Sequence, residues 1–93
     1  MTTPKLVLSD LTLSAVQAEA TRAHILHGPH SMLYGGDDRR CRILMEEIGE
    51  VARELNDAEI EGRPVDRDKL VKELLQSAAM CLTWVEAAEG GGS

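Results

Sequence analysis

The sequence contains almost no aromatic side chains. Among its 93 residues there is no Phe, and Tyr34 and Trp84 are the single Tyr and the single Trp. Without aromatic side chains, a core has to be built from Leu, Val, Ile, Ala and Met. This composition favours helices packed on helices over a β-sandwich, in which β-branched and aromatic residues dominate. The length corresponds to one small domain, and chains of this size often gain stability by oligomerising.

Positive charge and cysteine are also scarce. Ten Lys and Arg residues face sixteen Asp and Glu residues, which gives a net charge of −6 and argues against a general nucleic-acid-binding surface. The two cysteines, Cys41 and Cys81, have no metal-type spacing. We expect them to be small buried hydrophobes in a reducing compartment, with a disulfide as the less favoured alternative.

Long apolar runs are absent. None approaches the ~20 residues of a membrane span, and the first residues lack the basic and apolar blocks of a signal peptide. We therefore expect a cytoplasmic protein with no membrane partner. The closing GGGS, residues 90–93, resembles a flexible linker or an expression scar and is excluded from the fold.

Hydrophobic periodicity predicts an all-α domain over residues 1–89, a small antiparallel bundle of three main helices. After an N-terminal arm, residues 1–11, the first helix begins at a cap provided by Thr12 or Ser14 and stops at Gly28. A loop rich in Gly and Pro follows.

Capping residues also delimit the other two helices. Asp37 or Asp38 is expected to cap the second helix, which runs to about Glu59. Asp66 is expected to cap the third, which extends from residue 67 to about Glu89. The short turn between these helices makes them antiparallel.

The second helix carries five acidic residues in the segment LMEEIGEVARELND, residues 44–57. Glu46, Glu47, Glu50, Glu54 and Asp57 fall within an arc of roughly 100°. The expected core stripe lies beside them and contains Cys41, Leu44, Ile48, Val51, Ala52 and Leu55. The arc is open to interpretation as a solvated face, although like charges spaced at i and i+4 are unfavourable there.

The third helix is apolar nearly all round, which predicts that it is buried. Glu73 and Gln76 share one of its faces with Met80 and Trp84, and antiparallel packing could bring Glu73 opposite the acidic arc. Oxygen ligands without His or Cys indicate Mg²⁺ or Mn²⁺. The spacing alone leaves open a surface acidic stripe with Glu73 paired to Lys69 or Lys72.

The acidic pattern resembles a known signature. Glu46-Glu47-x-x-Glu50, followed by 22 residues and then Glu73-x-x-Gln76, is similar to the E-E-x-x-E, spacer, E-x-x-D motif of the MazG-like all-α nucleoside triphosphate pyrophosphohydrolases. The resemblance covers about residues 12–88 and is greatest to small MazG-like proteins of actinobacteria and their phages. It implies a four-helix core completed by a homodimer or a dimer of dimers.

The resemblance also implies an activity and a set of site residues. The reaction is Mg²⁺-dependent cleavage of a nucleoside triphosphate between the α and β phosphates, giving a monophosphate and pyrophosphate. Glu47, Glu50, Glu73 and Gln76 would be metal ligands, and Glu46 and Glu47 catalytic. Gln76 replaces the usual Asp and brings no negative charge, a loss for which Glu54 or Asp57 could compensate.

Further residues are weaker candidates for substrate contacts. Positive side chains that could hold phosphates are Arg39, Arg40, Arg42, Arg53, Lys69 and Lys72, although each is more often a simple surface charge. His24, His27 and His30 lack a usual zinc spacing, and a structural role is favoured, with a base or phosphate contact by His27 or His30 as the alternative. Trp84 could stack on a nucleobase, but a core or dimer-interface role is favoured.

Two other functional classes remain open. The first is a MazG-like nucleotide-binding or interaction module that is catalytically weakened or inactive. The second is a helical oligomerisation domain whose acidic residues are only a surface feature.

Overall fold

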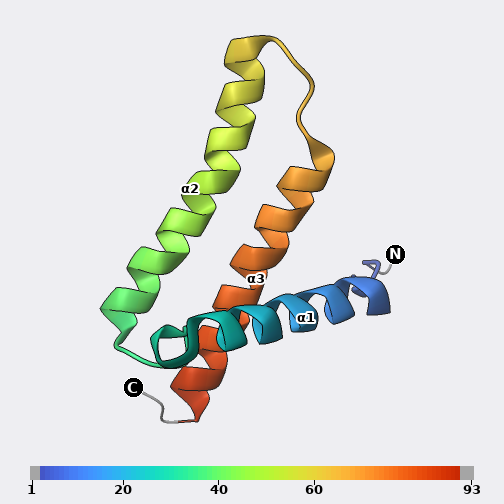
Figure 1. Cartoon of the computed structure of the whole chain (residues 1–93). Helices are drawn as coiled ribbons and strands as arrows, with labels where there is room; N and C mark the ends of the chain where they lie inside the picture. The colour runs from blue at the N-terminus through green and yellow to red at the C-terminus, as the bar shows by residue number, and fades with distance from the viewer. Residues whose placement is uncertain (1–2, 91–93) are drawn as a thin grey trace.

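A computed structural model describes residues 3–90, and all regular structure in this range is helical. Helix α1 spans Asp10–His27, the short 3₁₀ helix η1 spans Gly28–His30, α2 spans Asp37–Glu61 and α3 spans Arg67–Glu89. In Figure 1, α2 and α3 form an antiparallel hairpin and α1 crosses α3. The expected all-α architecture with three main helices is confirmed. None of these helices is long and apolar enough to cross a membrane.

Local capping explains where most helices begin. α3 starts as expected, because the Asp66 side chain accepts a hydrogen bond from the Lys69 N–H at 3.1 Å. α1 starts earlier than expected: Ser9 is its N-cap and accepts from the Thr12 N–H at 3.1 Å, so Thr12 and Ser14 lie inside the helix. The described part of the N-terminal arm is therefore residues 3–9. Of the GGGS tail, residues 91–93 lie outside the described range.

α2 is bounded by two glycines. Gly36, rather than the expected Asp37 or Asp38, takes the N-cap position, and it makes no side-chain cap hydrogen bond. Asp37 and Asp38 lie in the first turn, where their negative charge interacts favourably with the helix dipole. The helix continues past the expected end to Glu61, and Gly62 then stops it with a φ of 66°. This left-handed conformation costs glycine little, because it has no Cβ.

Two adjacent arginines hold the loop between η1 and α2. Arg40 is only 1% exposed, and it donates to the carbonyl oxygens of Met32 at 2.7 Å and Leu33 at 2.9 Å. Arg39 donates to the carbonyl oxygen of His30 at 2.6 Å. Both guanidinium groups, which the sequence offered as phosphate contacts, thus satisfy backbone acceptors of this loop.

The face of α2 that packs on α3 differs from the expected stripe. A line of buried and half-buried positions follows alternating steps of four and three residues: Arg40, Leu44, Glu47, Val51, Glu54 and Ala58. Four neighbouring positions, Arg39, Ile43, Glu50 and Asp57, are half-buried beside it. The prediction that Cys41, Ile48, Ala52 and Leu55 line the core was wrong, since all four are exposed. The inward face differs from the apolar stripe in that three of its positions, Arg40, Glu47 and Glu54, carry charged residues.

Glu54 is the most deeply buried acidic residue of this face, and the interpretation of it as a solvated residue was wrong. Its side chain is 2% exposed and receives hydrogen bonds from both terminal nitrogens of Arg63, at 2.8 and 3.2 Å. The Asp66 N–H donates to it at 3.0 Å, and the Lys69 ammonium lies 3.7 Å away. Hydrogen bonds from Arg63 and then from the Asp66 N–H lower the pKa of Glu54 from 4.5 to about 2.

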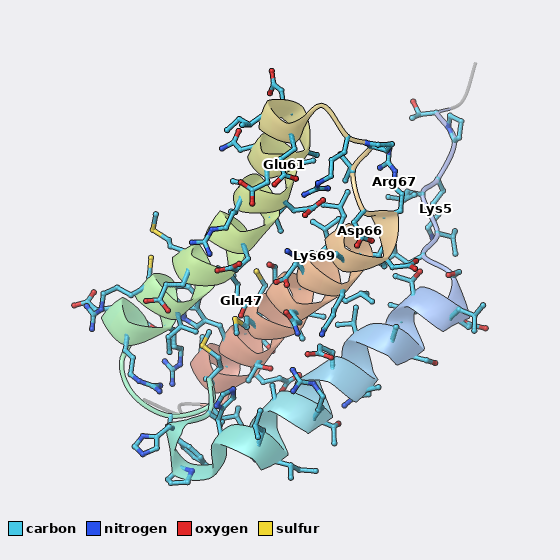
Figure 2. All side chains as sticks on the ribbon, turned by 45° about the horizontal axis from the view of Figure 1, so that its top comes forward. Lys5, Glu47, Glu61, Asp66, Arg67 and Lys69 are labelled. Carbon is cyan, nitrogen blue, oxygen red and sulfur yellow. The ribbon has the colours of Figure 1, made fainter. Side chains whose placement is uncertain are left out.

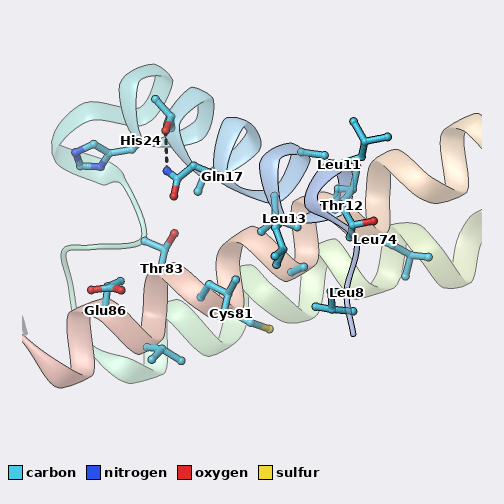
Figure 3. A pocket seen from close by; sticks show the side chains of 18 of the residues that line it. Leu8, Leu11, Thr12, Leu13, Gln17, His24, Leu74, Cys81, Thr83 and Glu86 are labelled. Carbon is cyan, nitrogen blue, oxygen red and sulfur yellow. Dashed lines mark hydrogen bonds between the residues drawn. The ribbon is translucent and has the colours of Figure 1, made fainter. Parts of the chain in front are cut away.

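A single chain leaves much of α3 uncovered, contrary to the expected burial. Leu74 is 48% exposed and Leu82 is 53% exposed, and Cys81 is also exposed. These side chains line an open apolar groove of about 1130 Å³ between α1 and α3 (Figure 3). The two expected buried cysteines are thus both exposed and both free: Cys41 lies outside the face of α2 that packs on α3, and Cys81 lies in the open groove.

The overall dimensions agree with incomplete packing. The radius of gyration is 15.5 Å, whereas a compact domain of this length has one of about 12 Å. The shortest dimension is 22 Å, about the thickness of two helices. The buried apolar side chains in the described range are Met32 and three alanines, which is a very small core.

The Glu54 contacts predict a specific pH dependence of stability. Because the pKa of Glu54 is about 2 in the folded state and 4.5 ordinarily, its stabilisation is complete above pH 4.5 and is lost as the pH falls towards 2. We expect Glu54→Gln to be less stable at neutral pH and to show a shallower acid decline. Urea unfolding at about pH 7 and about pH 3 measures both effects. Glu59→Gln, an exposed change on the same helix, is the control, and equal acid slopes in all three proteins would contradict this account.

Candidate acidic site between the helices

The register of α2 and α3 brings Glu47 opposite Glu73. At one end of the α2–α3 hairpin, the Glu54 carboxylate accepts a hydrogen bond from the Asp66 N–H. Near the other end, Asp37 Oδ1 accepts a hydrogen bond from the Trp84 Nε1–H at 2.9 Å. Glu47 lies two turns from Glu54, and Glu73 lies two turns beyond Asp66 on the facing helix. Figure 2 shows Glu47 on the side of α2 that faces α3. The predicted meeting of the acidic arc with Glu73 thus occurs, through Glu47.

Glu47 is held in an unfavourable environment for a charged group. One of its carboxylate oxygens, Oε2, is buried and has no hydrogen-bond partner among residues 3–90. Desolvation raises the pKa of Glu47, and repulsion from and hydrogen bonding to Glu73 raise it further, with smaller contributions from Glu50 and Glu19. Such a buried, unpaired acceptor is rare in proteins and costs stability unless something binds it.

The other predicted acids are more open. Glu50 is half-buried and forms an ion pair with Arg53, whose Nη1 lies 3.3 Å from Glu50 Oε1. Glu46 is exposed and lies at the edge of the cluster, next to Glu47 in the chain. Asp57 is half-buried, one turn from Glu54 and therefore distant along α2 from Glu47. Glu54, engaged by Arg63, is not available to compensate for Gln76.

Gln76 lies beside a carboxylate that the sequence pattern did not reveal. Glu19 of α1 is half-buried. The neighbouring Arg22, with smaller contributions from Gln76 and Lys72, lowers the pKa of Glu19. Arg22 has the largest effect; its Nε donates to Glu19 Oε1 at 3.0 Å. Glu19 was missed because its place in the site depends on how α1 crosses α3, and no local spacing encodes that crossing.

The predicted positive residues divide into two groups. Arg53 and Lys72 lie near the acidic cluster, through Glu50 and Glu19 respectively. Lys69 instead belongs with Glu54, one turn towards the hairpin connection. Arg42, on α2, is exposed. Arg22, which the sequence did not single out, is also close enough to Glu47 for their charges to interact.

Trp84 and the histidines lie apart from the acids. The indole of Trp84 is half-buried and bonded to Asp37, in agreement with a structural role. His24 Nδ1 lies 2.9 Å from the Ser31 hydroxyl, which fastens the loop after α1. His27 and His30 are exposed at the end of α1 and in η1. Nothing places His27 near Glu47.

The side chains of the acidic cluster offer the types of ligand atom that a hard divalent cation prefers. Carboxylate and amide oxygens are the ligands that Mg²⁺ and Mn²⁺ prefer, and Glu47 Oε2 is an acceptor with no hydrogen-bond partner in the part of the chain that the structure describes. Within residues 3–90, however, no three His, Cys, Asp or Glu side chains converge as a ready-made metal site. The cluster fits the predicted ion by its chemistry, and the side chains would have to draw together around it.

Comparisons of this chain with protein-family models, with curated protein sequences and with solved structures find no match.

The strain at Glu47 predicts a stabilising substitution. Because the pKa of Glu47 is raised above 4.5 in the folded state, ionisation of Glu47 lowers the stability of the fold, and this loss begins as the pH rises above 4.5 and is complete above the raised pKa. We expect Glu47→Gln to raise the melting temperature at neutral pH without divalent ions by roughly 2–4 °C, the effect of about 0.5 kcal/mol for one relieved like-charge contact. Thermal unfolding in a chelating buffer measures it. Glu46→Gln, its exposed neighbour, should change little, and a lower melting temperature for Glu47→Gln would contradict the interpretation.

Proposed function

We propose that this chain is a small Mg²⁺-dependent nucleoside triphosphate pyrophosphohydrolase of the MazG-like type, acting as a homodimer. The observation that carries the proposal is the inward-facing pair Glu47 and Glu73, with the buried Oε2 of Glu47 without a hydrogen-bond partner in the described part of the chain. A protein retains such a costly arrangement most readily where a cation relieves it during function. The sequence resemblance of Glu46-Glu47-x-x-Glu50 and Glu73-x-x-Gln76 gives that cation a role.

The proposed reaction is hydrolysis of one phosphoanhydride bond. The oxygen of a water molecule forms a bond to the α phosphorus, and the bond from that phosphorus to the oxygen bridging to the β phosphate breaks. The products are a nucleoside monophosphate and pyrophosphate, and the proton from water passes to a base. Bound Mg²⁺ would supply charge neutralisation on the phosphates and acidify the attacking water.

The protein's own side chains have separate tasks in this proposal. Glu47, Glu50, Glu73 and the Gln76 amide oxygen hold the cation. Glu46 is exposed beside them, keeps an open path to solvent, and is assigned to orient the water and accept its proton.

The net charge of the chain is consistent with this division of tasks. At −6 the protein repels a polyphosphate, so a cation has to mediate binding. Arg53 and Lys72 border the cluster and can each contact a phosphate. Lys69, His27 and Trp84 have other contacts or lie elsewhere, and we assign them no part in binding.

The alternative is a nucleotide-binding or interaction module that is catalytically weakened or inactive. Two observations favour it: Gln76 cannot act as a base, and no three acidic side chains in the described range already form a metal-binding group. The two functions predict the same fold and the same ligand and differ only in turnover.

Homodimerisation is part of the proposal because a single chain leaves so much apolar surface in contact with water. The groove between α1 and α3 is lined by Leu13, Val71, Leu74, Leu82 and Val85, all of them about half exposed. Burying one such side chain contributes about 1.5–3 kcal/mol. A second copy laid along this groove would surround α3 with helices and complete a four-helix core.

The activity is tested by measuring pyrophosphate release from a panel of nucleoside and deoxynucleoside triphosphates with Mg²⁺. We expect release with at least one of them, and a loss of at least about 100-fold in Glu50→Gln and Glu73→Gln, because each removes a charged ligand. Glu59→Gln, exposed and remote, should keep full activity.

The other outcomes separate the alternatives. No release, together with thermal stabilisation by nucleotide, would establish the inactive module, and Gln76→Asp would then be expected to gain activity. Absence of both release and stabilisation would contradict both functions and leave an oligomerisation domain.

The dimer is tested by substitution in the groove. We expect light scattering coupled to size-exclusion chromatography to report a dimer for the wild type and a monomer for Leu74→Lys and Leu82→Lys, because each buries an ammonium group in the interface. Ile60→Lys is the matched control: Ile60 is 82% exposed at the far end of α2, outside the groove. A monomeric wild type, or a dimer unaffected by the groove variants, would contradict the interface.

A further inference from the structure

The N-terminal arm, residues 3–9, carries apolar side chains that nothing in the described chain covers. Leu6 is 85% exposed, Val7 is 75% exposed and Leu8 is also exposed, so three consecutive apolar side chains meet water. No backbone hydrogen bond joins residues 3–8 to the rest of the described chain. Both the side chains and the backbone of the arm are therefore available to a second surface.

The open groove between α1 and α3 begins where the arm ends. Leu8 lines the end of the groove that contains Leu74, and Glu86 lines the other end (Figure 3). Along α3, the groove extends from Val71 to Glu86, which is a length of about 22 Å. Six extended residues span about 20 Å, so a segment such as residues 3–8 matches the groove in length.

The start of α1 keeps the arm of the same chain out of its own groove. The hydroxyl of Ser9, the N-cap, accepts a hydrogen bond from the Thr12 N–H at 3.1 Å. Leu8 and Leu13 then occupy the two positions of a hydrophobic staple, which fixes the angle at which a chain enters a helix. The two residues before Leu8 are exposed, and so the arm of one chain leaves its own groove open.

The charges of the arm and of the groove are complementary. Lys5 is the one charged residue of the arm, and Glu86 is the one Asp, Glu, Lys or Arg among the described residues that line the groove. Neither has an ion-pair partner within residues 3–90. Because alternate side chains of an extended segment point to the same side, Leu6 and Leu8 can enter the groove while Lys5 stays at its rim.

We propose that the N-terminal arm of a second copy of this chain occupies the groove, so that two chains exchange their arms about a two-fold axis. This inference rests on the homodimer of the proposed function and names the segment that covers the groove. A second copy is the occupant because the arm and the groove lack partners in the same chain, agree in length and carry opposite charges. In a two-fold pair, one exchange covers both surfaces of both chains.

The first experiment traps the exchanged arm with a disulfide. A chain with Lys5→Cys is mixed with a chain with Glu86→Cys, both also carrying Cys41→Ser and Cys81→Ser, and the mixture is oxidised. We expect mass spectrometry to detect a covalent heterodimer, because docking of the arm brings the two introduced thiols together. Lys5→Cys mixed with Glu59→Cys, an exposed position on α2, is the control. A dimeric protein that yields no more heterodimer than this control would overturn the inference.

The second experiment measures dimer affinity by analytical ultracentrifugation. We expect Leu6→Asp to raise the dissociation constant of the dimer at least about 100-fold, because each dimer loses two buried leucines. Leu6 is exposed in a single chain, so circular dichroism should show the helix content of the wild type. Ile60→Asp is the matched control, since Ile60 is equally exposed but lies outside the groove, and it should leave the dissociation constant unchanged.

The outcomes separate this inference from the proposed function. A Leu6→Asp protein that dimerises as tightly as the wild type, while Leu74→Lys is monomeric, would overturn the arm exchange and leave the dimer standing. A monomeric wild type would overturn the proposed dimer and the arm exchange with it. A wild type that exchanges its arms but releases no pyrophosphate would support this inference and contradict the hydrolase.

Discussion

The buried carboxylate of Glu54 fixes the arrangement on which the rest of the molecule depends. It accepts hydrogen bonds from the guanidinium of Arg63, in the connection between α2 and α3, and from the N–H of Asp66, at the start of α3. One carboxylate therefore links α2, the connection and α3. A charge in such a place is tolerable only because several donors satisfy it at once. With this end of the hairpin fixed, the position of every later contact between α2 and α3 follows, including that of Glu47 with Glu73.

The molecule combines charged groups inside with apolar groups outside. Arg40 and Glu54 are among its most buried residues, whereas Leu74, Leu82 and Ile48 face the solvent. The interior charges satisfy loop carbonyls and a helix terminus, and therefore organise the chain more than they stabilise it. Much of the stabilisation that a core normally gives is therefore missing, because the apolar groove between α1 and α3 stays open to solvent.

Sequence reasoning succeeded where the determining interactions are local. Asp66 was identified as a cap because capping depends on residues three apart, and Gly28 was identified as a stop for a similar reason. The meeting of the acidic arc with Glu73 was also predictable, because a short turn forces neighbouring helices to run antiparallel. These are properties of one helix or of one hairpin.

The errors concern contacts that local patterns do not encode. The inward face of α2 was placed on the stripe containing Cys41 and Ile48, because hydrophobicity assigns buried positions to apolar residues and Arg40 and Glu54 break that rule. The position of Glu19 depends on where α1 crosses α3, a long-range relation with no signature in spacing. The exposed cysteines were missed for a related reason: Cys41 was assigned to the apolar stripe of α2 and Cys81 to a fully covered α3, and neither assignment can be read from local spacing.

The hydrogen bonds at the two ends of the α2–α3 interface also disfavour alternative pairings of these helices in which one helix is shifted along the other. Alternating small and large apolar side chains along two helices allow them to slide by one turn and pack nearly as well, because one aliphatic residue substitutes readily for another. A slip of that kind would take Glu54 away from the Asp66 N–H and would separate the Trp84 indole from Asp37. Each end would then hold an unsatisfied polar group, a mismatch that apolar contacts cannot repair. The hairpin therefore discriminates against shifted pairings by hydrogen-bond geometry, which gives a chain with a very small core a single way to close.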